Sequence, residues 1–134
     1  METTSYALKT TVNLPFEEAI DKVTEELKLE GFGVLTQIDV QDTLRKKLDV
    51  NFRKYKILGA CNPPNAYKAL QTEPDIGLML PCNVVVYEGE GRATVVAAVD
   101  PVASMKAVEN SALESTAREV RRKLQRVIEA MERG

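Results

Sequence analysis

Two segments of the chain contain the same Cys-Asn pair, and together they decide the predicted fold: YKILGACNPP at residues 55–64 and LPCNVVVYE at residues 80–88. The first segment has the pattern of a strand and stops at Pro63, because proline lacks the amide donor that a sheet requires. The second segment begins a strand directly after Pro81. If these strands are neighbours, one polar spot contains the side chains of Cys61, Asn62, Cys82 and Asn83.

Five segments of the sequence are predicted to be strands. Most of them alternate apolar and polar residues, which is typical of a half-buried strand, and they cover residues 6–12, 34–40, 54–60, 82–87 and 92–99. The valines at 84–86 instead indicate a strand that is buried on both faces. Residues 88–91 contain two glycines and predict a hairpin, which makes the last two strands antiparallel.

Two long amphipathic helices are predicted from apolar residues at helical spacing. The first has the stripe Phe16, Ala19, Ile20, Val23 and Leu27, and the second has Leu113, Ala117, Val120, Leu124, Val127, Ile128 and Met131. Shorter helices are predicted at 42–48, 64–70 and 101–108. Helices this few and this unevenly placed do not fit a doubly wound parallel sheet. We therefore predict a single α+β domain over residues 1–134, with a mainly antiparallel sheet of four to five strands that carries both long helices on one face.

The composition limits the possible partners and the compartment. Hydrophobic residues make up 44% and charged residues 28% of the 134, as in ordinary globular proteins. The sequence lacks an apolar run of about 20 residues, and residues 1–6 lack a secretory signal pattern, so we expect a cytoplasmic protein without a membrane partner. A net charge of −2 and a pI near 5.3 argue against nucleic-acid binding, which needs a basic surface.

The absence of histidine from the sequence excludes several kinds of chemistry within one chain. Ser-His and Cys-His nucleophilic machinery, histidine general bases and zinc sites with imidazole ligands all need this residue. Proton transfer would have to use Cys, Asp, Glu, Lys or Tyr. The two cysteines are expected to be free thiols, because disulfides are rare in the cytoplasm.

Asn62 is predicted to cap a helix. It precedes two prolines, which suit the first helical positions, and its side chain can accept a hydrogen bond from a free amide of the first turn. Cys61 would then lie beside the positive end of that helix, where the pKa of a thiol is lowered. Cysteine is also a common core residue. Cys61 is therefore open to two interpretations, a buried structural thiol and a reactive thiolate.

A convergence of Cys61 and Cys82 would allow a redox pair, a soft-metal site or a place for a sulfur ligand. The spacing is not that of a CxxC motif, and two sulfur ligands without histidine leave a zinc sphere incomplete. Copper(I), or a metal shared between the subunits of a dimer, is compatible with soft thiolate ligands. The sequence identifies no particular cofactor.

Three elements of the sequence closely resemble the domain-of-unknown-function 302 family: LGACNP at residues 58–63, GLMLPCNVVVYE at residues 77–88, and Asp100-Pro101. The resemblance covers nearly the whole chain. It implies an α+β fold similar to half of the TATA-box-binding protein, with a β-α-β4-α core, short inserted helices and a homodimer. The Asn-Pro and Leu-Pro positions match the family pattern, whereas the two cysteines look like a feature of one branch.

The leading hypothesis is a small cytoplasmic homodimeric binding module, with a ligand or soft-metal pocket near Cys61, Asn62, Cys82 and Asn83. One alternative is a thiol-dependent sulfur-transfer or redox enzyme that uses Cys61. The other alternative is an interaction protein without a small-molecule site, which acts through its sheet edge or its last helix. The family has no settled reaction that would decide among the three, and fold alone does not imply function.

Overall fold

The computed structural model describes residues 1–133, which form one six-stranded sheet with the order β1-β2-β6-β5-β4-β3. All neighbouring strands are antiparallel. The strands are β1 (Glu2–Thr3), β2 (Ala7–Val12), β3 (Gly33–Asp39), β4 (Tyr55–Cys61), β5 (Cys82–Glu88) and β6 (Thr94–Val99). The predicted α+β class is confirmed. The sheet has one strand more than predicted, because Glu2 and Thr3 pair with the outer edge of β2.

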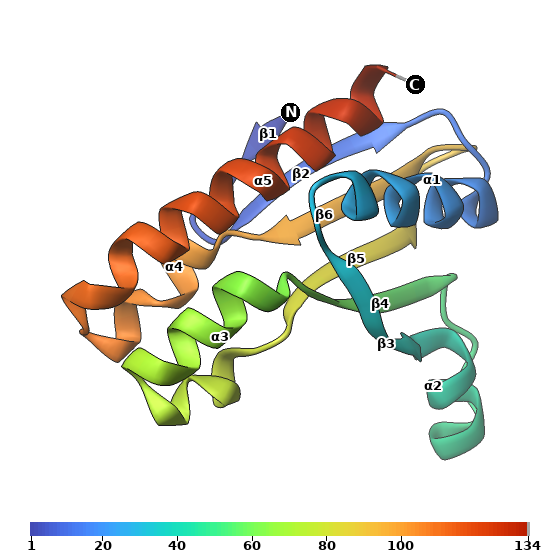
Figure 1. Cartoon of the computed structure of the whole chain (residues 1–134). Helices are drawn as coiled ribbons and strands as arrows, with labels where there is room; N and C mark the ends of the chain where they lie inside the picture. Colours follow the sequence, from blue (N-terminus) through green and yellow to red (C-terminus); the bar gives the residue numbers. More distant parts are fainter. Residues whose placement is uncertain (134) are drawn as a thin grey trace.

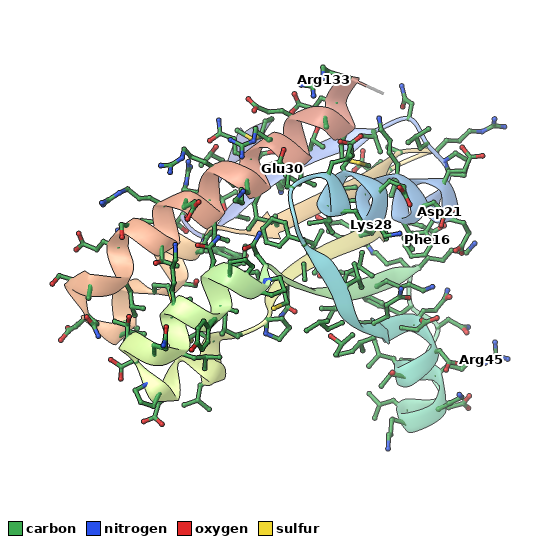
Figure 2. All side chains as sticks on the ribbon, in the orientation of Figure 1. Phe16, Asp21, Lys28, Glu30, Arg45 and Arg133 are labelled. Carbon is green, nitrogen blue, oxygen red and sulfur yellow. The ribbon has the colours of Figure 1, made fainter. Side chains whose placement is uncertain are left out.

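The two long helices, α1 (Phe16–Leu29) and α5 (Glu114–Arg133), lie side by side on one face of the sheet (Figure 1). Their apolar stripes pack against every second residue of the central strands, as the period of two in a strand requires. Figure 2 shows Glu30 beside α5, where it pairs with Arg126 at 2.8 Å. The fully buried centre of this core includes Leu8, Val23, Leu27, Leu58, Val84, Val86, Val96, Leu124 and Ile128.

The middle of the other face of the sheet is apolar and partly exposed, with Lys9 beside Ala97 and Asn83 farther along β5. Ile57, Val85 and Ala97 lie next to one another across three strands, because Val85 pairs with both of its neighbours. All three are half-buried. The prediction that the valine run is buried on both faces is therefore wrong for Val85. Only Val84 and Val86 reach the core, since α1 and α5 both cover the same face.

Short helices fill connections between strands and the connection from β6 to α5, and most gather at one end of the sheet (Figure 1). They are α2 (Val40–Leu48), α3 (Pro63–Thr72) and α4 (Pro101–Ser104), with single 3-10 segments at Pro74–Met79, Lys106–Val108 and Ser111–Leu113. A second, smaller core of Ala69, Ile76 and Leu113 joins them. The order of the main elements, β2-α1-β3-β4-β5-β6-α5, confirms the β-α-β4-α core with short inserted helices.

The start of the chain lies beside α5 (Figure 1), and the α-amino group of Met1 pairs with Glu132 of that helix. None of the helices formed by residues 1–133 combines the length and apolar character that crossing a bilayer requires.

Candidate functional site

A cavity of about 320 Å³ lies where β4 ends and β5 begins, between the main core and the smaller second core. Its walls come from β4 and the start of β5, from β3 and the residue before it, from α3 and the segment that follows it, from α4 and the segment that follows it, and from the start of α5. The large side chains that line it are apolar: Phe32, Leu35, Leu70, Leu80, Pro81, Met105, Leu113 and Val120. The residues that line it include no acidic or basic side chain.

Three of the four residues predicted to form a site line this cavity. Cys61 is the last residue of β4, Asn62 follows it, and Cys82 is the first residue of β5, paired across the sheet with Ala60. Asn83 is not among the lining residues. It is exposed and pairs with Gly59. Because successive side chains in a strand alternate, the side chain of Asn83 points to the opposite face of the sheet from that of Cys82.

Asn62 occupies the N-cap position of α3, in agreement with the sequence interpretation. It is only 8% exposed, and its Oδ1 accepts a hydrogen bond from the backbone N–H of Asn65 at 3.4 Å. Its Nδ2 donates to the backbone carbonyls of Glu30 and Gly31, at 3.3 and 3.4 Å. This one side chain therefore ties the start of α3 to the turn that follows α1.

Sequence reasoning missed a polar residue in the cavity wall, Asn65. The side chain lies one helical turn after Asn62, is 5% exposed, and donates through Nδ2 to Asn62 Oδ1 at 3.0 Å. Within residues 1–133 its own Oδ1 has no hydrogen-bond partner. The signal in the sequence was the spacing of three between Asn62 and Asn65, which puts both at the same end of one helix.

Cys82 is a buried thiol rather than a thiolate. Burial raises its pKa to about 11, and the nearby Cys61 thiol adds to the rise. Cys82 therefore keeps its proton at neutral pH and is a poor nucleophile and a poor metal ligand. Cys61 is half-buried at the cavity wall, and both cysteines are free.

The structure offers little to a metal ion. Within residues 1–133 there is no group of three or more Cys, Asp or Glu side chains that could hold one. The cavity contributes two thiols in mostly apolar walls, and burial raises the pKa of one of them, Cys82, to about 11. Soft-metal binding needs deprotonated thiols. The cavity is thus better suited to an apolar organic molecule than to the soft metal that the sequence left open.

Comparisons with known proteins agree with this fold. The family model described as "Domain of unknown function DUF302" matches residues 8–131. The chain is also similar to a solved structure, described as the crystal structure of an uncharacterized conserved protein DUF302 from Bacillus stearothermophilus, with a TM-score of 0.87. The two sequences are 30% identical, and the match covers 94% of this chain and 98% of the other. No curated protein gave a significant match.

Proposed function

The chain belongs to the family of the domain of unknown function DUF302, and we propose that it is a small homodimeric binding module that holds an apolar small molecule beside Cys61, Asn62 and Cys82. The observation that carries this proposal is the cavity itself. Pockets for small molecules are concave, mostly apolar, and have a few polar groups that orient the ligand. A volume of about 320 Å³ is at the small end of the usual range for such pockets.

The position of the cavity supports a role in binding. It lies between two separate cores, so its walls are held by packing on both sides and do not depend on a ligand to form. Water in a space lined by Phe32, Leu80 and Met105 finds few hydrogen-bond partners. An apolar ligand that displaces this water removes its own apolar surface and that of the cavity wall from solvent, which favours binding.

Binding is favoured over the thiol-dependent enzyme because the cavity lacks groups that transfer protons. Its lining residues include no Asp, Glu, Lys or Tyr, and the thiol of Cys82 stays protonated at neutral pH. A nucleophile is normally activated by an adjacent base or by a lowered pKa. Cys61 would have to act without a base in the cavity.

A fluorescence titration with Nile red, an uncharged apolar dye, tests the proposal. We expect saturable binding with increased emission by the wild-type protein. Replacing the half-buried Ala66 of α3 with phenylalanine fills part of the cavity and should weaken binding at least tenfold. The matched control is Gln71→Phe, which adds the same side chain to an exposed position of α3 outside the cavity. Absence of binding by the wild type, or equal affinity of both variants, would count against the proposal.

The homodimer is part of the same proposal. Ile57, Val85 and Ala97 form a partly exposed apolar face on the sheet, and a second copy of the chain would cover it.

We also assign the module to the cytoplasm, where its free cysteines remain reduced. We expect no nucleic-acid partner, because the net charge of the chain is −2. Sedimentation velocity and cell fractionation test the dimer and the compartment.

A further inference from the structure

Helix α2 stands out from the sheet on the side opposite to α1 and α5 (Figure 1). Its main contacts are with β3 and β4, and no residue of α2 is buried by the rest of residues 1–133. A helix of nine residues gains most of its stability from packing an apolar side against another element, because so short a helix is barely stable alone in water. The apolar side of α2 therefore calls for a partner outside the described chain.

Residues 40–54, which contain α2 and the segment that leads into β4, form an arm with an exposed apolar side. Leu44 and Leu48 lie four residues apart and share one side of the helix. Leu48 is 66% exposed and Phe52 is 40% exposed, and Val50 between them is exposed as well. Arg45, by contrast, points away from the sheet (Figure 2). The arm thus leaves large apolar side chains in solvent.

The apolar sheet face has the size and the chemistry to receive such a helix. Its centre, Ile57, Val85 and Ala97, spans three neighbouring strands, which is about 10 Å at the usual strand spacing. A helix of nine residues is about 14 Å long. The arm of the same copy does not reach this centre, because α2 starts beyond the end of the β3–β4 ladder. The helix that covers the face must therefore come from another molecule.

The charges of the arm favour a second copy of this chain as that molecule. The chain has 18 basic and 20 acidic side chains, and five of the basic and two of the acidic ones lie in residues 40–54. The arm therefore has a net charge of +3 and the rest of the chain a net charge of −5. Opposite charges attract the arm of one copy to the body of another and speed their encounter.

We propose that the arm joins two copies of this chain: in a symmetric dimer, each arm lies across the apolar sheet face of the other copy, with Leu48 and Phe52 against Val85. This inference rests on the proposed homodimer and adds the element that makes the contact. A two-fold axis uses the same contact twice, as is usual in homodimers. The dimer then has a helical layer on both faces of each sheet, which is how domains usually cover apolar sheet faces.

A pair of matched double variants tests the role of the arm. Leu48→Gln with Phe52→Gln removes the apolar side chains without changing the charge, and both positions are exposed, so the chain should still fold. Thr43→Gln with Asn51→Gln is the control at exposed polar positions of the same arm. We expect the first variant to raise the dissociation constant of the dimer at least 100-fold in sedimentation velocity experiments, because four apolar side chains lose their contacts. The control should match the wild type.

Crosslinking tests where the arm lies. Leu48→Cys and Ala97→Cys are made in separate chains, one of them with an affinity tag that changes its mass, and the mixture is treated with a short bismaleimide. We expect a product of the combined mass, since Ala97 belongs to the face that the arm covers. A mixture of Ala97→Cys with the wild type is the control for links through Cys61.

The outcomes separate this inference from the proposed function. A dimer that survives Leu48→Gln with Phe52→Gln, or a weakened dimer without the crosslink, would overturn the role of the arm and leave the homodimer standing. A monomeric wild type would overturn both, and binding of oligo(dT) by that monomer would assign the basic arm to a nucleic acid instead. Binding of Nile red to the cavity should be the same in all these variants, because the arm residues do not line it.

Discussion

Arg121 of α5 donates from Nε to Oδ2 of Asp100 at 3.0 Å, while Oδ1 of the same carboxylate accepts from the backbone N–H groups of Val102 and Ala103. The side chain of Asp100 therefore caps α4 and links it to α5. Asp100 is 8% exposed, so this pair is shielded from water better than an ordinary surface ion pair. The link holds in place the part of the cavity wall that Pro101 provides.

We expect Asp100→Asn to lower the free energy of unfolding by about 1–2 kcal/mol, because a hydrogen bond to a charged, partly buried group is lost. The amide can still cap α4, but its NH₂ group cannot accept from Arg121. Urea denaturation measures the change. Glu114→Gln is the matched control, since it removes an exposed ion pair with Arg118 on the same helix. The control should differ from the wild type by less than about 0.5 kcal/mol. Equal effects of both variants would contradict the structural role of Asp100.

Gly59 is expected to be the glycine of the sheet that tolerates substitution least. A Cβ atom there would lie 2.2 Å from Thr36 Oγ1 and 2.7 Å from Pro81 Cγ, both too close for normal contacts. We predict that Gly59→Ala lowers the free energy of unfolding by about 1–3 kcal/mol through overpacking. Gly33 is the control, because a Cβ atom at Gly33 has no neighbour within 4 Å. Thermal unfolding of both variants measures the difference. Equal stability of Gly59→Ala and Gly33→Ala would contradict the prediction.

The main elements of the fold could be predicted from the sequence because their patterns are local. The apolar stripe that includes Val23 and Leu27 has the period of a helix, and the strand that ends at Cys61 is stopped by Pro63. Strand β1 could not be found in this way. Two residues are too few to show a period, and the strand exists only because the edge of β2 offers hydrogen bonds.

Part of the candidate site could also be predicted, because the ends of its strands are marked by local sequence patterns. Strand ends indicated that Cys61, Asn62 and Cys82 would meet, and all three line the cavity. The alternation of side chains, already visible in the sequence, would have placed Asn83 on the other face of the sheet. The spacing of three from Asn62 pointed to Asn65, but its burial and the missing partner of its Oδ1 are visible only in three dimensions.

The thiol of Cys82 should make stability depend on pH in the alkaline range. Burial raises its pKa to about 11 from an ordinary value of 9.0, so the unfolded chain loses this proton first. The contribution of the neutral thiol is therefore complete below pH 9 and is lost as the pH rises toward 11. We expect the wild type to lose about 2 kcal/mol more than Cys82→Ala between pH 8 and pH 11. Guanidinium denaturation at pH 8 and pH 11 measures both, and equal losses in the two proteins would contradict the prediction.

The apolar sheet face should determine whether the chain dimerises. Val85 lies at its centre, next to Ile57 and Ala97, and the rings of Tyr55 and Tyr87 stack on the same face with their centroids 5.1 Å apart. Aromatic residues are enriched in protein interfaces, whereas lysine is depleted, because burying an unpaired charge is unfavourable. We therefore expect Val85→Lys to convert the dimer into a monomer in sedimentation velocity experiments. Gln71→Lys adds the same charge to an exposed position of α3 and should leave the dimer intact, whereas a monomeric wild type would refute this assignment.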